Sequence, residues 1–362
     1  MGGELKVTPE FRKKAAEDNA ASLARMGLKP DTVEVWEDGY RTAEEKDAFE
    51  WWYFDAQFDN GSTAVVTFST KPHTKPKGPL APIVLIMYRS PQGESVRYSP
   101  GYAPEELAAS SEGCDVRIGP SWVKGDLASY ELHAEAEDMA VDLALKRQGP
   151  SWRPGAAVSY FNSAKTKYLA WVVPVPYGTV EGTITRGGAT TAVKGSVYHD
   201  HNWGNAVMGN MLDHWFWGRA HVGDFSIIFS QLVTIKVFGL GGIKLPVFFL
   251  SKGDRILTDD GLPLRLETAD EVDGPMGQTY PRKLDFTWEA EEGRVEMAIR
   301  DPKLIEVLDM TEDLSHWRRS LAHIFGNPLY YDFDAELELS VDLAGVKEKT
   351  SGRVIFEKMM FH

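Results

Sequence analysis

The sequence has 362 residues, in which 39 lysines and arginines stand against 53 aspartates and glutamates, for a formal net charge of −14. Hydrophobic residues make up 43% and charged residues 25%, which is typical of folded globular proteins and excludes a disordered chain. The acidic balance, without a basic stripe, argues against binding to nucleic acid or to an anionic membrane. The single cysteine, Cys114, excludes an internal disulfide.

The length exceeds what one domain usually contains, so we expect two domains or one large β architecture. No run of about 18 apolar residues is present, and the first residues lack the apolar segment of a secretory signal. We therefore expect no membrane-spanning segment and a cytoplasmic location.

The N-terminal segment, residues 1–33, predicts a helical extension. Thr8 is a helix-capping residue, Pro9 suits the first helical position, and Gly27 and Pro30 mark the end of the helix. Because charged residues predominate between these ends, we expect a peripheral helix that lies across the fold.

From about Glu34 the sequence consists of short alternating or β-branched runs that are separated by turn residues, with no regular helices between them. This pattern predicts an all-β protein of sandwiches or barrels. The expected strands cover residues 62–70, 82–89, 129–136, 139–147, 169–186, 195–204, 214–223, 225–237, 246–254, 284–291, 293–301, 334–343 and 353–361. We expect two β domains, 34–205 and 206–362.

One further helix is expected near the C-terminus. Thr311 precedes two acidic residues that suit a helix N-terminus, and Gly326 begins a Gly-Asn-Pro stop signal. Trp317, Leu321 and Ile324 recur at helical spacing between them, which predicts a helix that plugs or flanks a barrel.

The densest polar and aromatic cluster is Tyr198-His-Asp-His-Asn-Trp-Gly204. Strand alternation places Tyr198, Asp200 and Asn202 on one face and the two histidines on the other. A carboxyl beside a phenol and an amide can donate a proton, hold a water molecule and orient a substrate oxygen. Burial among aromatic residues would raise the carboxyl pKa, which suits a general acid. Alternatively, Asp200 satisfies backbone groups at a strand end.

The two histidines of this cluster, His199 and His201, would point in the same direction, as metal ligands on a strand do. His214 and His221 are near in sequence, but no third ligand follows at a defined spacing. We therefore expect no metal site and interpret the histidines as hydrogen-bonding groups.

Two aromatic runs could line a binding pocket. Trp215, Trp217 and Arg219 alternate onto one face of a strand, and Glu50 and Trp52 share a face of another. Such stripes can stabilise a cation or hold an apolar ligand. They can equally be ordinary core packing between two buried faces.

Several motifs are absent: a P-loop, a G-x-G-x-x-G turn, a G-x-S-x-G elbow and an H-E-x-x-H pair. Cys114 lies in an expected loop without a flanking signature. These absences argue against nucleotide-driven and thiol-driven chemistry, and we expect no cofactor.

Four motifs occur together in one order: E-W-W-Y-F-D-A at 50–56, W-V-V-P at 171–174, Y-H-D-H-N-W-G at 198–204 and W-F-W-G-R-A at 215–220. In this respect the chain resembles the lipocalin-like hydroxyneurosporene synthase (carotenoid 1,2-hydratase) superfamily. That superfamily also includes AttH-like proteins, kievitone hydratase and fungal decalin-forming Diels–Alderases. The resemblance implies two calycin-type β-barrel or sandwich domains with a large apolar pocket at or near their junction.

Hydratases of this superfamily add water to an isolated alkene of an isoprenoid or prenylated substrate without a redox cofactor. The resemblance implies that Asp200 protonates the alkene and that Tyr198 or Asn202 places the attacking water. Indole rings that would stabilise the cation belong to Trp171, Trp215 and Trp217. The substrate-binding residues expected overall are Glu50, Trp52, Trp171, His201, Trp215, Trp217 and Arg219.

The chain departs from the carotenoid hydratases at residues 171–182, which lack their His–Trp pair and are closer to the Diels–Alderase pattern. Three functions therefore stay open: a hydratase, an intramolecular cyclase or isomerase in natural-product biosynthesis, and a carrier of a hydrophobic small molecule. The expected partner is a hydrophobic small-molecule substrate, and a homodimer is left open.

Overall fold

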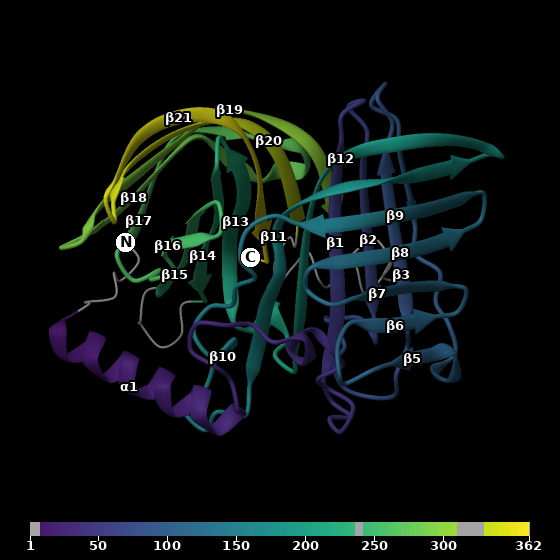
Figure 1. Ribbon diagram of the computed structural model, residues 1–362, viewed down its shortest axis with the longest axis horizontal. Coiled ribbons are helices and arrows are strands. Elements are labelled where there is room, and N and C mark those ends of the chain that lie inside the picture. Colours follow the sequence, from purple (N-terminus) through teal and green to yellow (C-terminus); the bar gives the residue numbers. More distant parts are fainter. Residues whose placement is uncertain (1–7, 236–241, 310–328, 362) are drawn as a thin grey trace. The chain divides into compact units, whose positions relative to one another are not determined.

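The computed structural model describes residues 8–235, 242–309 and 329–361 (Figure 1). The chain divides into two compact units, one of which comprises Glu10–Val207 while the other contains the described residues from Met208 onward. The boundary between the two expected β domains lies at 205/206, and these domain limits stay a prediction. The helix expected at 311–325 lies outside the described residues.

The first unit begins with helix α1 (Pro9–Met26), in agreement with the predicted helical extension. Gly27 follows it with a φ of +70°, a left-handed conformation that glycine adopts without strain. The helix buries little of its surface. Leu23 is its buried residue, and Leu23 packs with Leu28 and Ala156.

The first unit is built on one twelve-stranded antiparallel sheet in the order β4-β3-β2-β1-β12-β11-β9-β8-β7-β6-β5, with β10 paired to β11. Its strands are β1 (Phe49–Phe58), β2 (Thr63–Ser69), β3 (Ile83–Arg89), β4 (Ser95–Tyr98), β5 (Leu107–Ala109), β6 (Asp115–Ile118), β7 (Ser121–Gly125), β8 (Ser129–Ala136), β9 (Met139–Arg147), β10 (Val158–Tyr160), β11 (Tyr168–Arg186) and β12 (Ala189–Gly204). Short 3-10 helices are η1 (Val35–Asp38) and η2 (Pro104–Glu106).

This sheet folds over its own apolar face. Strands β3 and β8 are far apart in the strand order but contact each other, and the two halves of the sheet face each other in Figure 1. The core between them takes alternate residues of the strands, among them Trp52, Phe54 and Phe68. Strand alternation thus assigns one face of β1 and β12 to this core and leaves the other face outside it.

Strand β11 carries two prolines, Pro174 and Pro176, which have no backbone N–H to donate. The pairing of β11 with β12 shifts register between Val172 and Val175 and again between Val175 and Gly178. Proline is tolerated in a paired strand at such bulges. The bulges therefore interrupt the hydrogen-bond ladder between β11 and β12. Trp171 lies on one side of this interruption, and the hairpin that joins the two strands lies on the other.

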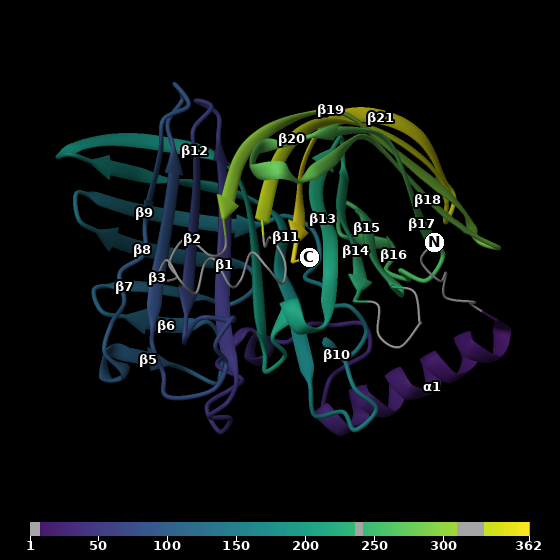
Figure 2. The ribbon, with the colours of Figure 1, turned by 180° about the vertical axis from the view of Figure 1, so that it is seen from behind.

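The second unit is a nine-stranded antiparallel sheet in the order β16-β15-β14-β13-β21-β20-β19-β18-β17. Its strands are β13 (Leu212–Val222), β14 (Phe225–Thr234), β15 (Lys244–Lys252), β16 (Arg255–Thr258), β17 (Leu264–Asp273), β18 (Thr279–Ala290), β19 (Gly293–Asp309), β20 (Leu329–Leu343) and β21 (Val346–Met360). Short 3-10 helices are η3 (Met208–Asn210) and η4 (Pro275–Gly277). Figure 2 shows this sheet curling as a half-barrel, and β15 contacts β17 across the curl.

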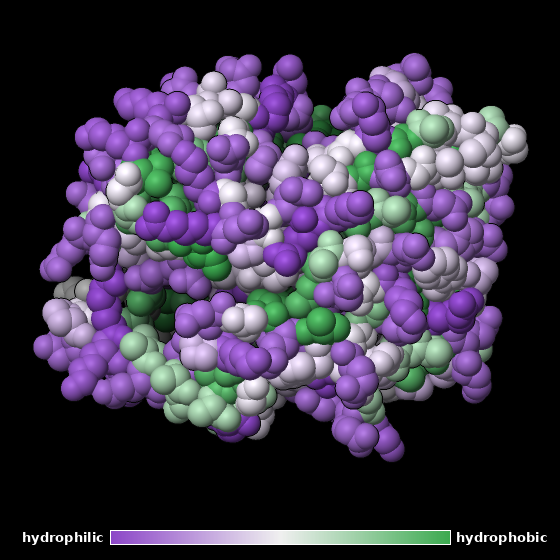
Figure 3. Space-filling model, viewed as in Figure 1, coloured by the Kyte–Doolittle hydropathy of each residue, from purple (hydrophilic) through white to green (hydrophobic). Residues whose placement is uncertain are grey.

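These two sheets confirm the predicted all-β, lipocalin-like architecture. No helix among the described residues is long and apolar enough to cross a membrane. The face shown in Figure 3 is mostly hydrophilic, as the composition predicts, with smaller apolar areas.

Candidate functional site

Strand β12 positions the polar residues that the sequence analysis singled out. It pairs with β1 on one side and with β11 on the other, so every residue of the Tyr198–Gly204 motif has neighbours across a ladder. Asp200 lies opposite Tyr53 of β1, and Asn202 lies between Trp51 of β1 and Trp171 of β11. The predicted face of Tyr198, Asp200 and Asn202 is therefore extended by aromatic side chains from both neighbouring strands.

The Asp200 carboxyl is the centre of this face. One oxygen, Oδ2, accepts hydrogen bonds from the Tyr198 hydroxyl at 2.8 Å and from the Trp171 indole N–H at 3.0 Å. The other oxygen, Oδ1, accepts from the Asn202 amide at 2.8 Å. Asp200 is 8% exposed and Tyr198 is completely buried. Three neutral donors thus converge on one buried carboxylate, and we name Trp171, Tyr198, Asp200 and Asn202 the Asp200 group.

Burial raises the pKa of Asp200 to about 6, because an ionised carboxylate loses its hydration there. The hydrogen bond from Tyr198, the charge of His199 and the hydrogen bond from Trp171 act in the opposite direction. A carboxyl with this pKa exchanges its proton near neutral pH, while its donors favour the ionised form. The group can therefore give up a proton to a substrate and stabilise the charge that remains.

The opposite face of β12 carries a second set of charged groups. Nε2 of His199 lies 3.1 Å from Oδ2 of Asp38, and Nε2 of His201 lies 2.7 Å from Oε1 of Glu50. Glu50 also accepts from the Thr42 hydroxyl at 2.8 Å. The side chains of His199, His201, Asp38 and Glu50 are at most 1% exposed.

This arrangement separates the expected site residues. Glu50, Trp52 and His201 lie on the core face of the sheet, whereas the Asp200 group lies on the other face. Trp52 stacks on the His201 ring at 4.6 Å, and its indole N–H donates to the Asp38 carbonyl at 2.9 Å. These three residues and the Asp200 group therefore do not line one common surface of the sheet.

The remaining expected residues belong to the second unit. Trp215, Trp217 and Arg219 alternate along β13 with Phe216 and Ala220, which face the core of the half-barrel. The Trp215 indole N–H donates to Glu357 of β21 at 2.7 Å. These three residues thus share the face of β13 that points away from that core, as strand alternation predicted.

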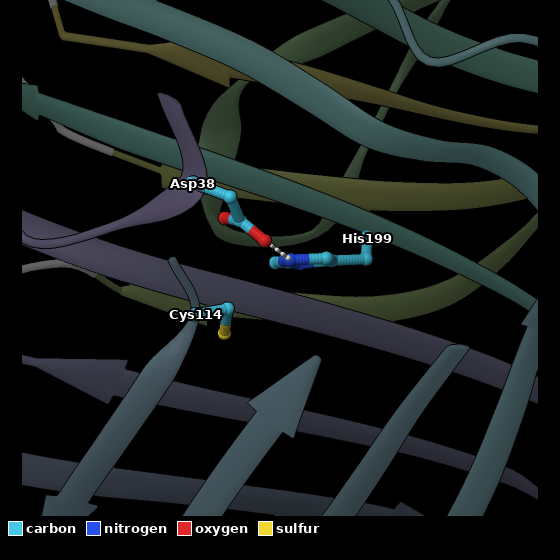
Figure 4. Close-up of side chains that lie close together, drawn as sticks. All are labelled: Asp38, Cys114 and His199. Carbon is cyan, nitrogen blue, oxygen red and sulfur yellow. Dashed lines mark hydrogen bonds and ion pairs between the residues drawn. The ribbon is translucent and has the colours of Figure 1, made fainter. Parts of the chain in front are cut away.

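The sequence analysis missed Asp38, Tyr130 and the role of Cys114. The Tyr130 hydroxyl donates to Oδ2 of Asp38 at 2.6 Å, and burial together with the Asp38 charge raises the pKa of the Cys114 thiol. Three atoms that could bind a metal lie within 4.8 Å of one another: a carboxylate oxygen of Asp38, the Cys114 sulfur and a ring nitrogen of His199 (Figure 4). They come from segments far apart in the sequence, so no local spacing could have indicated them.

No family model matches the chain. By sequence it is similar to two curated proteins, the quinolone epoxide rearrangement proteins penF of Penicillium thymicola and asqO of Emericella nidulans. It is 22% identical to penF over 213 residues, which cover 51% of this chain and 56% of penF. It is 25% identical to asqO over 209 residues, which cover 51% of this chain and 54% of asqO. The chain thus spans about half the length of the curated relatives it matches.

By structure the chain is similar to three solved proteins along most of its length. CghA superimposes with a TM-score of 0.64 at 14% identity, covering 92% of this chain and 94% of CghA. A putative AttH from Nitrosomonas europaea gives 0.60 at 16% identity, covering 92% and 99%. Kievitone hydratase from Nectria haematococca gives 0.53 at 14% identity, covering 92% and 97%.

These similarities define the fold: the chain has the lipocalin-like fold that it shares with CghA, the putative AttH and kievitone hydratase. The resemblance stated from the sequence motifs is confirmed at the level of this fold.

Proposed function

We propose that the chain is a hydratase in which Asp200 donates the proton that starts the addition of water to an alkene of a hydrophobic, terpenoid or prenylated substrate. The observation that carries the proposal is the Asp200 group, in which a buried carboxyl receives hydrogen bonds from an indole, a phenol and an amide. The names of the similar proteins, a hydratase and two rearrangement proteins, support an acid-catalysed reaction in general.

The three donors stabilise the Asp200 carboxyl more strongly after it has given up its proton than before. A protonated Asp200 transfers its proton to one alkene carbon and becomes a carboxylate, while the other carbon becomes a cation. All three donors can then hydrogen-bond the new negative charge, so the stabilisation grows as the reaction proceeds. A water molecule attacks the cation, and its surplus proton returns to the Asp200 carboxylate. The net change is the addition of one water molecule.

The Trp171 ring is the aromatic group of the first unit that this mechanism uses to stabilise the cation. Its N–H bond to Oδ2 places the indole directly beside the carboxyl, and the Trp152 ring packs against it edge-on at 5.5 Å. An indole held in this way presents a fixed electron-rich face to a positive charge. Trp215 and Trp217 belong to the second unit, and their role in substrate binding stays a prediction.

A second candidate is an isomerase that rearranges its substrate without adding water. The specific observation in its favour is that both curated relatives are named quinolone epoxide rearrangement proteins. The same proton donor would then protonate an epoxide oxygen, and the proton would return to Asp200 when the rearranged product forms. Substrate and product would have the same mass.

The two candidates are distinguished by incubating the purified chain in H₂¹⁸O with a panel of prenylated arenes, isoprenoid alkenes and aryl epoxides, followed by mass spectrometry of the products. Hydration adds one labelled water, and rearrangement leaves the mass unchanged. Asp200→Asn should abolish either product, while Asp142→Asn, at an exposed carboxyl of β9, should not affect it. A product that persists in Asp200→Asn would refute the proton-donor role. Stoichiometric retention of an unchanged ligand would indicate a carrier.

A further inference from the structure

The core face of β12 carries a buried cluster that the proposed reaction does not use. We name Asp38, Cys114, His199, His201 and Glu50 the Asp38 cluster. Its members come from η1, from the bend before β6, from β12 and from β1. All of them are at most 1% exposed.

Three members of the cluster offer metal-ligand atoms at short range. A carboxylate oxygen of Asp38, the Cys114 sulfur and a ring nitrogen of His199 all lie within 4.8 Å of one another. Oδ2 of Asp38 and Nε2 of His199 are 3.1 Å apart, and Figure 4 shows the carboxylate directed at the edge of the imidazole ring. Ligand atoms at about 2.0–2.3 Å from a tetrahedral ion are roughly 3.2–3.8 Å from one another. Small side-chain rotations would therefore bring the three atoms to bonding distance.

The contact between His199 and Asp38 joins a ring nitrogen to a carboxylate oxygen. Nδ1 of His199 donates to the Tyr53 carbonyl at 2.9 Å, because a carbonyl can only accept. In the neutral ring, Nε2 then bears a lone pair, yet it faces Oδ2 of Asp38, which already accepts from the Tyr130 hydroxyl. Either a proton or a metal ion between Nε2 and Oδ2 completes this contact.

The second oxygen of Asp38 has no hydrogen-bond donor among the described residues. Oδ1 of Asp38 and Nδ1 of His201 are both buried and both lack a hydrogen-bond partner, and they lie 3.5 Å apart. The other ring nitrogen of His201 is already engaged with Glu50. A buried polar atom without a partner is destabilising, and more so when it is charged. The hydrogen bonds of the cluster therefore leave two of its buried polar atoms without a partner.

The surroundings of both imidazoles are those of metal-binding histidines. Such histidines usually donate their second ring N–H to a carbonyl or a carboxylate, which fixes the ring orientation. His199 does so with Tyr53, and His201 with Glu50. The Phe54 ring stacks on His199 at 4.0 Å, so the plane of this imidazole is also fixed by packing.

We propose that Asp38, Cys114 and His199 bind one divalent transition-metal ion, with Zn²⁺ the ion that best fits a mixed oxygen, sulfur and nitrogen ligand set. Such a set on a buried site is typical of zinc, which accepts all three ligand types. Binding releases the thiol proton of Cys114 to solvent, and the resulting thiolate is the sulfur ligand. Nδ1 of His201 lies 3.5 Å from the second oxygen of Asp38.

The metal would cross-link three segments that the sheet itself does not join. Asp38 ends η1, Cys114 lies before β6, and His199 lies in the middle of β12, directly beside Asp200 in sequence. The existence of this site does not depend on the reaction proposed for Asp200.

The test uses the full chain, purified without a polyhistidine tag and dialysed without chelator. Elemental analysis should find about one zinc per chain, and X-ray absorption at the zinc edge should show one sulfur neighbour at about 2.3 Å. After chelator treatment, added Co²⁺ should produce a thiolate-to-cobalt charge-transfer band at one equivalent. No bound metal and no such band, or a bound metal without a sulfur neighbour, would overturn the proposal. Protonated histidines would then account for the cluster.

Variants test the same assignment. Cys114→Ser should abolish the charge-transfer band, and Tyr130→Phe, which removes a hydrogen bond to a ligand, should weaken Co²⁺ binding by about 10- to 100-fold. The matched control is His133→Gln, because His133 is a partly exposed histidine with Asp142 and Glu135 beside it. Binding that survives in Cys114→Ser but is lost in His133→Gln would place the metal at the surface and refute the assignment. The absorption measurement on the unchanged chain requires no variant to fold.

Discussion

The raised pKa of Asp200 predicts a specific dependence of stability on pH. A carboxyl that titrates at about 6 in the folded chain and at its ordinary value of 3.8 in the unfolded chain is shifted by about 2.2 pKa units. One unit corresponds to about 1.36 kcal/mol, so the ionised folded form is destabilised by about 3 kcal/mol. Because the folded state binds more protons between these two pKa values, its stability falls as the pH rises through that window.

The substitution Asp200→Asn removes this titration. Between pH 4 and pH 7 the free energy of unfolding of Asp200→Asn, measured relative to that of the unchanged chain, should rise by about 2–3 kcal/mol. All other titrating groups are common to both proteins and cancel in this difference. The measurement is equilibrium urea unfolding, followed by circular dichroism, at both pH values in a chelating buffer.

A difference that is the same at pH 4 and pH 7 would refute the reasoning, because it would mean that burial does not raise the pKa of Asp200. If the free energy of unfolding of Asp200→Asn relative to the unchanged chain instead falls between pH 4 and pH 7, the donors of the Asp200 group outweigh burial and lower its pKa. Carbon NMR titration of the Asp200 carboxyl provides a direct control on the same samples.

Three further predictions concern single contacts. Tyr198→Phe removes one donor to the carboxylate that forms during proton transfer, and the rate of turnover should fall by about 100-fold or more. Gly218→Ala should destabilise the second unit by about 1–3 kcal/mol in thermal unfolding, because the added Cβ would lie 2.3 Å from the buried ring of Phe229. Arg153→Met should cost about 3–5 kcal/mol in urea unfolding, because it leaves the buried Glu37 carboxylate without its ion-pair partner.

Each of these changes has a matched control. For the Tyr198 variant, binding of a substrate analogue should be almost unchanged, so that a loss of binding equal to the loss of rate would contradict the role in proton transfer. Gly101→Ala introduces a Cβ whose nearest neighbour is 3.9 Å away, and it should be almost neutral. Replacing Glu37 by Gln together with Arg153→Met should recover part of the lost stability, and no recovery would exclude the unpaired charge as the cause.

Strands were predictable where one face is buried and the other is exposed, because the sequence then alternates. The predicted ranges 129–136 and 139–147 agree with β8 and β9, whose buried residues alternate with exposed ones. The short strands β4, β5 and β6 were missed, since three or four residues contain too little alternation to identify a strand. The sequence predicted that a strand continues through Pro174, in agreement with β11. It did not predict the bulges of β11, because these depend on pairing partners that the sequence does not specify.

The division of the site into two faces was only partly predictable. Alternation alone assigned Tyr198, Asp200 and Asn202 to one side of β12, and their hydrogen bonds agree with that assignment. Alternation does not say which side faces a core when aromatic residues occur on both. Glu50 and Trp52 were therefore grouped with Asp200, although they lie on the opposite side. Asp38 could not be recognised at all, because the partners of its carboxylate, Tyr130 and His199, are 92 and 161 positions away along the chain.

The pairing of β1 with β12 has a consequence for how the protein is made. The two strands register from Phe49 opposite Gly204 to Phe58 opposite Gly195, so the ribosome must add more than a hundred residues between them. At about 5–20 residues per second this takes roughly 7–30 s. During that interval β1 can pair with β2 alone, and its other edge remains open to unwanted partners. The nascent chain thus exposes an unpaired strand edge until β12 emerges, and a chaperone that covers β1 would act in this window.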